Sequence, residues 1–303
     1  MSIVVFFLVL GAAFLHAGWN FLSKKNVPSW GFYAVSNAVA TLLLLPAYVA
    51  LGGSIPTDGE GFRPILAGSV CMEMLYFAGL IYAYRRGDLS FVYPMMRGIP
   101  VVLVAVLSAA FSLGRSLNPG AWAGLAVVAA GIFFASFSRS TTRGGMGGSG
   151  GGASAGVIGF VLLGAAGVAG YTLLDSVAMR MLSETGRDSM AVALVYLFLV
   201  EVFLTAGLLA VAGLTHRGRS SLTTCLKAPR NAILTGVFFT IAYLLVLIAM
   251  PLADNVSYIQ AFRQISLPLG MLAGVIWLKE RPSPARLAGL GTMLAGLVIM
   301  AMA

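Results

Sequence analysis

The sequence contains ten blocks of about 20 predominantly apolar residues, separated by short polar, glycine- or proline-containing breaks. A helix needs about 20 apolar residues to cross the hydrocarbon core of a bilayer, whereas a membrane barrel would show alternation over about ten residues. The blocks therefore predict an all-α integral membrane protein with ten transmembrane helices. The spans that we expect are residues 2–22, 31–51, 64–84, 89–112, 119–138, 155–178, 189–213, 230–250, 255–278 and 284–303.

Composition excludes the other broad classes of protein. Apolar residues make up 59% of the 303 residues and charged residues only 10%, whereas soluble domains have about 25% charged residues. This leaves too little polar surface for a soluble fold and too much hydrophobicity for disorder. The lipid bilayer is the expected partner. The net charge of +9 lies mostly in short loops beside the spans, so no nucleic-acid partner is predicted.

The chain divides into two similar halves around a Gly/Ser-rich linker at residues 139–154. Residues 10–13 recur at 163–166, and Arg97 corresponds to Arg263 at a shift of 166 residues. We therefore expect two five-helix repeats, residues 1–138 and 155–303. Because five is odd, the second repeat must start on the opposite side of the membrane. Inverted repeats are typical of secondary transporters, although some channels also have them.

The distribution of basic residues predicts the orientation of the chain. Most of its 19 Lys and Arg residues lie in the connections after the odd-numbered spans. Positive loops face the cytoplasm. The sequence thus predicts a multi-pass protein of the cell (plasma or inner) membrane with both termini outside.

Three segments carry a resemblance to a known family. They are residues 16–20 (HAGWN), residues 90–100 (SFVYPMMRGIP), and residues 257–270 followed by Lys279 and Glu280. With the duplication, they make almost the whole chain resemble the EamA-type carriers of the drug/metabolite transporter (DMT) superfamily. One departure is Arg115, which stands in the first half where the second half has Glu280. The resemblance implies solute transport through a central cavity lined by spans 1, 3, 4, 6, 8 and 9.

Arg97 and Arg263 are the leading candidates for substrate binding. A charge inside the bilayer costs about 3 kcal/mol on insertion scales, so each must face water or a partner. Pseudo-symmetry would bring them to opposite walls of one cavity, and a guanidinium suits carboxylate or phosphonate oxygens. Alternatively, each satisfies carbonyl groups freed by nearby prolines. The other expected substrate-binding residues are Tyr258, Gln260, Gln264, Tyr93, Trp19, Asn20 and Tyr171.

Two further polar residues in the spans are candidates for coupling. Glu73 could carry a proton or act as the counter-ion of Arg97 or Arg263, and His16 could titrate near neutral pH. A lone histidine in a span can equally be a structural hydrogen-bonding group. Glu201 is a weaker candidate because the resemblance makes its helix peripheral, and Asp175 is expected near the membrane interface.

Three prolines interrupt the backbone hydrogen bonding of the spans. Pro94 and Pro100 lie early in the fourth span and Pro268 lies in the ninth. Each removes a backbone donor and frees a carbonyl one turn earlier. We interpret them as hinge candidates, with static kinks as the alternative.

These features predict a secondary active transporter rather than an enzyme. It would move a small metabolite, with an amino-acid-like, anionic or zwitterionic solute favoured, by alternating access. Transport would be coupled to protons or another ion, or would occur by exchange. A flippase for lipid-linked substrates is the main alternative, ahead of a channel or membrane-embedded enzyme. No cofactor or metal is expected, and small-residue patterns such as Gly120-x3-Gly124 allow a homodimer.

Overall fold

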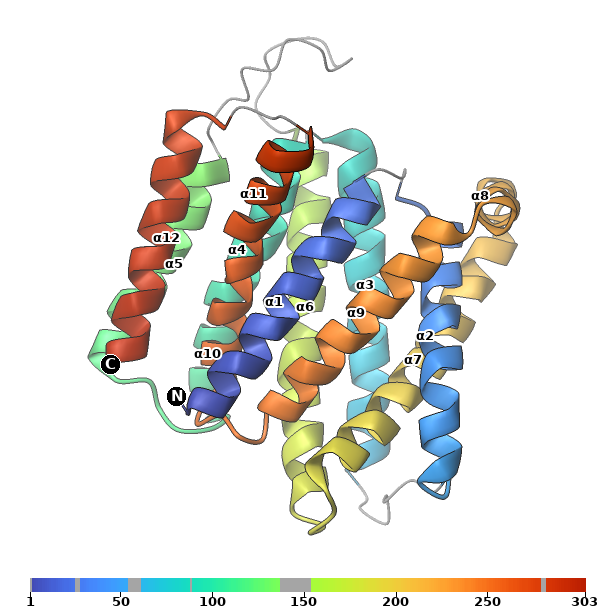
Figure 1. Ribbon diagram of the computed structural model, residues 1–303, viewed down its shortest axis with the longest axis horizontal. Helices are drawn as coiled ribbons and strands as arrows, with labels where there is room; N and C mark the ends of the chain where they lie inside the picture. The colour runs from blue at the N-terminus through green and yellow to red at the C-terminus, as the bar shows by residue number, and fades with distance from the viewer. Residues whose placement is uncertain (1, 25–27, 54–60, 88, 137–153, 279–281) are drawn as a thin grey trace.

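The computed structural model describes residues 2–24, 28–53, 61–87, 89–136, 154–278 and 282–303, and regular structure within these ranges is entirely helical (Figure 1). The helices are α1 (Ile3–Lys24), α2 (Trp30–Ala50), α3 (Phe62–Arg86), α4 (Leu89–Ala110), α5 (Pro119–Ser136), α6 (Ala155–Ser183), α7 (Ser189–Leu214), α8 (His216–Lys227), α9 (Arg230–Ala249), α10 (Val256–Phe262), a 3-10 turn η1 (Arg263–Ile265), α11 (Ser266–Leu278) and α12 (Pro284–Met302).

Short polar side chains begin many of these helices. A Ser, Thr, Asp or Asn directly before a helix can accept a hydrogen bond from a backbone N–H that has no partner in the first turn. Such bonds are made by Ser29, Ser154, Asp188, Thr215, Asn255 and Ser283. The apolar blocks and these capping residues together explain where the helices start.

The helices have the length and surface of membrane spans. In the described part of the chain, eight are long and apolar enough to cross a bilayer, and Pro94–Ala110 forms a shorter apolar helix. Large apolar side chains such as Phe7, Leu42, Phe111, Phe203 and Ile276 are exposed on the outside of the bundle. An apolar exterior is expected where lipid replaces water. The protein is therefore a membrane-embedded helical protein.

The ninth expected span is not one continuous helix. Residues 256–278 form α10, the 3-10 turn η1 and α11 instead. Pro268 explains the break, because it has no N–H to bond the carbonyl of residue 264, which lies in η1. By contrast, α4 remains helical through Pro94 and Pro100.

The long helices run roughly along one direction, and the two termini lie at the same end of the bundle, the lower end in Figure 1. The first helix, α1, leads away from this end, whereas α6 leads toward it. The short helix α8 is seen end-on and so lies across the others, beside the upper ends of α2 and α9. Its residues were expected to form only a connection between spans.

Four helix pairs provide much of the packing: α3 with α6, α5 with α12, α1 with α9, and α2 with α7. Glycines permit the closest of these approaches. A Cβ atom at Gly131 of α5 would lie 2.4 Å from the backbone nitrogen of Met293 in α12. Similarly, a Cβ atom at Gly79 of α3 would lie 2.4 Å from the nitrogen of Gly164 in α6. Small residues that bring backbones together are a common means of packing membrane helices.

Candidate functional site

A cavity with an empty volume of about 890 Å³, including its opening, lies within the bundle. It is polar on part of its wall although it is enclosed by apolar helices, which is the arrangement expected of a small-molecule site. Its lining residues are His16, Trp19, Asn20, Tyr33, Asn37, Glu73, Tyr76, Phe77, Leu80, Tyr84, Met96, Arg97, Val168, Tyr171, Glu201, Leu204, Phe239, Tyr243, Gln260 and Arg263.

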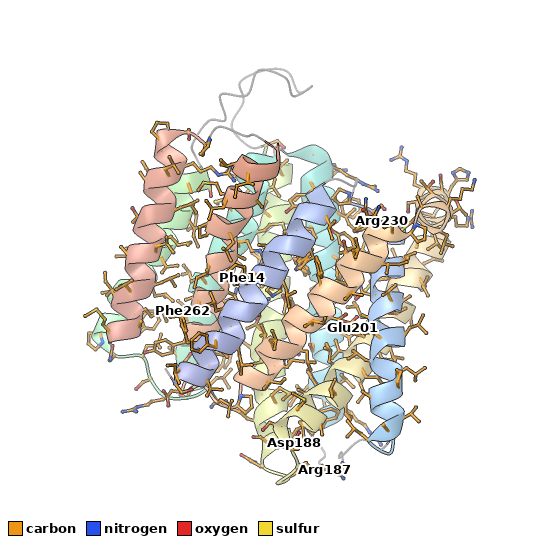
Figure 2. All side chains as sticks on the ribbon, in the orientation of Figure 1. Phe14, Arg187, Asp188, Glu201, Arg230 and Phe262 are labelled. Carbon is orange, nitrogen blue, oxygen red and sulfur yellow. The ribbon has the colours of Figure 1, made fainter. Side chains whose placement is uncertain are left out.

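The cavity extends from mid-bundle toward the upper end. Tyr33 comes from the start of α2 and Tyr84 from the end of α3, and both of these helix ends lie at the top of Figure 1. Glu201 lies at about mid-height, whereas Arg187 and Asp188 mark the lower end (Figure 2). The lining residues therefore extend from mid-bundle to the upper surface.

Hydrogen bonds join the two halves of the chain at the lower end of the bundle. The Asn255 side chain, at the start of α10, donates to the Ser108 hydroxyl at 3.0 Å and to the Arg115 carbonyl at 2.9 Å. The backbone N–H of Arg115 donates to the Asp254 carbonyl, also at 2.9 Å. These contacts join the α4–α5 connection to the segment before α10.

Arg263 lies at the helix break and is almost fully buried, with 3% of its surface exposed. Its Nη2 atom lies 3.4 Å from Nε2 of His16 and its Nη1 atom lies 3.4 Å from Oε1 of Gln260. The guanidinium carbon is 5.6 Å from the centre of the Tyr243 ring. Within the described residues, Nε of Arg263 has no hydrogen-bond partner. A buried guanidinium with an unused donor is suited to bind an anionic group.

The bonding of His16 determines what faces Arg263. Nε1 of Trp19 donates to Nδ1 of His16 at 2.8 Å, and a neutral imidazole has only one acceptor nitrogen. Nε2 of His16 must therefore carry the proton. As a result, the N–H of His16 and the nearest N–H of Arg263 are both donors and meet without an acceptor between them. An anion placed beside them would accept hydrogen bonds from both.

The second arginine of the predicted pair reaches the same region. The guanidinium carbon of Arg97, from α4, is 6.0 Å from the centre of the Trp19 ring. Each arginine thus contacts one member of the hydrogen-bonded Trp19–His16 pair on α1. Asn20 is tied to the same stretch, because its Nδ2 donates to the His16 carbonyl at 2.6 Å. The structure brings these predicted residues together with Tyr171 and Gln260 in one cavity.

Acceptor groups line another part of the cavity wall. Glu73 of α3 is buried there, as are Glu201 of α7 and Asn37 of α2. In the described part of the structure, Oε2 of Glu201 and Oδ1 of Asn37 have no hydrogen-bond partner. Buried acceptors are expensive to leave unsatisfied. The cavity therefore has arginine side chains on α4 and η1, a neutral histidine donor on α1, and, among the described residues, unused acceptors on α2 and α7.

Asp175 lies near the cavity and not at the membrane interface, the position expected from its place in the sequence. None of its surface is exposed. Ser69 and Tyr196 donate hydroxyl hydrogen bonds to Oδ1, the latter at 2.5 Å, and Tyr243 donates to Oδ2. Tyr243 also lines the cavity. The expected position was wrong because α6 continues to Ser183, beyond the expected end of the span at residue 178. Asp175 is therefore not at the end of its helix.

The remaining predicted residues have other positions. Gln264 is buried with its side-chain Nε2 donating to the Gln260 carbonyl at 3.0 Å, and Tyr258 is half-buried on α10. Neither is among the residues that line the cavity. The side chain of Tyr93 lies outside the described part of the structure, as do Lys279 and Glu280. No cluster of three metal-ligating side chains occurs among the described residues.

Two helices line the cavity in addition to those implied by the resemblance. Tyr33 and Asn37 come from α2, and Glu201 and Leu204 come from α7. The prediction that the helix carrying Glu201 is peripheral was wrong. The position of Glu201 in the middle of a span indicates the correct location, because an ionisable residue there is expected to face the bundle interior or a cavity.

Comparison with known proteins identifies the fold and nothing further. The sequence matches no family model and no curated protein. A solved structure described as "Crystal structure of protein" superposes with a TM-score of 0.69, covering 100% of this chain and 98% of its own. The two sequences are 18% identical. The chain therefore has a fold that occurs in a solved structure of nearly the same length.

Proposed function

We propose that this protein is a secondary transporter of the drug/metabolite transporter superfamily that moves a small anionic or zwitterionic solute by alternating access. The observation that carries this proposal is the unmatched pair of donors formed by His16 and Arg263 inside a membrane-embedded cavity. A buried arginine with unused hydrogen-bonding capacity is costly in a membrane. A bound carboxylate or phosphonate would supply the missing acceptor.

The acceptor groups of the cavity wall favour a zwitterion over a simple anion. Glu201 and Asn37 each present a buried oxygen without a hydrogen-bond partner in the described structure, and Glu73 lies in the same cavity. An ammonium group has three donors and no acceptor, so it would satisfy these oxygens. An amino-acid-like solute thus fits with its acid toward Arg263 and its amine toward Glu201.

The packing supports two inverted repeats of five helices, α1–α5 and α6, α7, α9, α10–α11 and α12. In the two repeats α1 is equivalent to α6, α2 to α7, α3 to α9 and α5 to α12. Exchanging equivalent helices therefore converts the pair α3–α6 into α9–α1. It leaves α2–α7 and α5–α12 unchanged, and these four pairs are among the most extensively packed. The opposite directions of α1 and α6 also agree with inversion (Figure 1). In this proposal α10, η1 and α11 together form one of ten spans.

The orientation follows from the positive-inside rule. Arg85, Arg86, Arg217, Arg219 and Arg230 lie at the ends of helices that reach the upper surface. We place this surface in the cytoplasm and both termini outside. The cavity would then be in contact with the cytoplasm, and the Asn255 contacts would close the outer side of the cell or inner membrane.

The test is a ligand thermal-shift screen on the detergent-purified protein. The panel contains amino acids, phosphonates, organic acids, nucleosides and cationic drugs. A ligand at 100 times its Kd stabilises the folded state by about 2.7 kcal/mol. Each compound is tested on the wild type, on Arg263→Ala, and on Arg230→Ala as a matched control, because Arg230 is exposed at the start of α9.

The expected result is a zwitterionic or anionic compound that raises the Tm of the wild type and of Arg230→Ala but not that of Arg263→Ala. An equal shift in all three proteins would disprove the role of Arg263. A cationic compound that still binds Arg263→Ala would move the site to the acidic wall. No shift with any soluble compound would favour the lipid-linked substrate class over a small metabolite.

A further inference from the structure

Asp175 is a fully buried carboxyl group beside the cavity. In the described structure its hydrogen bonds come only from hydroxyl groups, on Ser69, Tyr196 and Tyr243. These residues belong to α3, α7 and α9, so four helices meet at this carboxyl group. Arg263 is in electrostatic range of Asp175, but its guanidinium donates to Gln260 and lies beside Nε2 of His16.

Hydroxyl partners allow a carboxyl group to exist in two protonation states. An ionised carboxylate only accepts hydrogen bonds, whereas a protonated one also donates. A hydroxyl group can rotate to donate or to accept, which a lysine or arginine cannot do. The Asp175 site can therefore satisfy its polar atoms with and without the proton. A purely structural ion pair would fix the ionised state.

Tyr243 connects this carboxyl group to the cavity. Its hydroxyl donates to Oδ2 of Asp175, while the residue itself lines the cavity. Its ring also lies beside Arg263 and packs edge-on against Tyr171 with a centroid separation of 5.8 Å. A solute that binds Arg263 would therefore contact the same side chain that bonds Asp175.

We propose that Asp175 is a proton-carrying site that exchanges one proton with the aqueous cavity through the hydroxyl of Tyr243. In the loading step, Tyr243 gives its hydroxyl proton to Oδ2 of Asp175 and receives one from a hydronium ion in the cavity, which becomes water. The reverse step returns the proton, and no other bond changes. The proposal rests on the proposed transport function for its purpose, but the titration itself does not require a known substrate.

Other charged groups surround the site and must be separated from it in any pH experiment. Titratable or charged side chains reach the site from several neighbouring helices. The contribution of α10 is Gln260, which does not titrate. The titratable or charged side chains are His16 on α1, Tyr33 on α2, Glu73, Tyr76 and Tyr84 on α3, Arg97 on α4, Tyr171 on α6, Tyr196 and Glu201 on α7, Tyr243 on α9, and Arg263 on η1.

Infrared difference spectroscopy during a pH titration of the full-length protein tests the proposal, with the proton as the probe. A carboxyl group that takes up a proton gains a carbonyl stretching band. We expect one such band to be present in the wild type and in Glu73→Gln and to be absent in Asp175→Asn. Tyr243→Phe removes one hydroxyl donor and should move the midpoint of this band to higher pH, because the ionised form loses a stabilising bond.

An identical set of carbonyl bands in the wild type and Asp175→Asn would overturn the proposal and leave Asp175 as a structural link. A midpoint unchanged by Tyr243→Phe would overturn the relay through that hydroxyl. If Asp175→Asn does not fold, Ser69→Ala is used instead. It removes the hydroxyl donor to Oδ1, so it should also move the midpoint of the band to higher pH. These results do not depend on transport, so a failure of the transporter proposal would be seen separately in the ligand screen.

Discussion

Asn255 and Ser108 are hydrogen-bonded to each other although they are 147 residues apart in the sequence and belong to opposite halves of the chain. The distance from Nδ2 of Asn255 to the Ser108 hydroxyl is 3.0 Å, and the hydroxyl lies 3.2 Å from Oδ1. The same amide also caps α10 by accepting from the N–H of Ser257 at 2.8 Å. One side chain therefore both starts a helix and joins the two halves at the lower end of the bundle.

Replacing Asn255 by Ala should make the cavity accessible from the lower end. The change removes the bonds to Ser108 and Arg115, and each such bond contributes about 1 kcal/mol. The two bonds together contribute about 2 kcal/mol, so we expect the population open at the lower end to rise by about thirtyfold. The measurement is labelling of a Phe239→Cys reporter in the cavity by an impermeant maleimide applied from each side, in a background without the native cysteines.

Ser108→Ala is the matched control for this experiment, because it removes one partner but leaves the cap of α10 intact. Its effect should have the same direction and be smaller. If Asn255→Ala leaves labelling from the lower side unchanged, the contacts do not govern closure.

Replacing Trp19 by Phe should weaken binding of an anionic ligand by changing which nitrogen of His16 carries the proton. Without the Trp19 N–H, the proton of His16 is free to move to Nδ1, and Nε2 then accepts from Arg263. This internal bond competes with the ligand at a cost of about 1 kcal/mol, which corresponds to an approximately fivefold increase in Kd. Thermal-shift titration with the compound found in the screen measures this change in Kd.

Trp122→Phe on α5 is the control for loss of an indole group, since Trp122 does not line the cavity. Equal affinities of the Trp19 and Trp122 variants would argue against the proposed protonation of His16.

The close contact between α5 and α12 should make Gly131 intolerant of a side chain. A Cβ atom there would lie 2.4 Å from the nitrogen of Met293 and 2.6 Å from the carbonyl oxygen of Gly289. Gly131→Ala should therefore destabilise the protein by about 1–3 kcal/mol, the usual range for overpacking. Thermal unfolding in detergent measures the change.

Gly291 of α12 provides a matched control, because a Cβ atom there would have no neighbour within 4 Å. Gly291→Ala should leave the Tm unchanged or raise it slightly, since alanine favours helix over glycine. A similar loss of stability in both variants would contradict the packing argument.

Cys225 should report both the orientation of the protein and the environment of α8. Partial burial raises the pKa of its thiol above the ordinary value. Because the thiolate is the reactive form, maleimide labelling should be slow at neutral pH and accelerate as the pH rises through the raised pKa. If the upper surface is cytoplasmic, an impermeant maleimide should reach Cys225 only from that side.

Thr224→Cys in a Cys225→Ser background is the comparison, because Thr224 is exposed on the same short helix. It should react faster at neutral pH and from the same side. Labelling of either position from outside the cell would reverse the proposed orientation.

The sequence by itself determined the helical class, the membrane environment and most helix boundaries. These depend on local properties: the length of an apolar block, a capping side chain such as Ser29 or Asp188, and the placement of basic residues. The same local reasoning also predicted that Arg97, Arg263, Glu73 and His16 would face the interior, because a polar group within a span must avoid lipid.

The tertiary structure decided which of these groups meet and in what state. Glu201 and Asp175 are buried because their helices pack against α2, α3 and α9, which are distant in the sequence. The proton on Nε2 of His16 depends on its bond to Trp19, and the unused donors of Arg263 depend on the helix break before Pro268. Such contacts arise from packing between helices, and the apolar pattern of a single helix is nearly the same for any choice of neighbours.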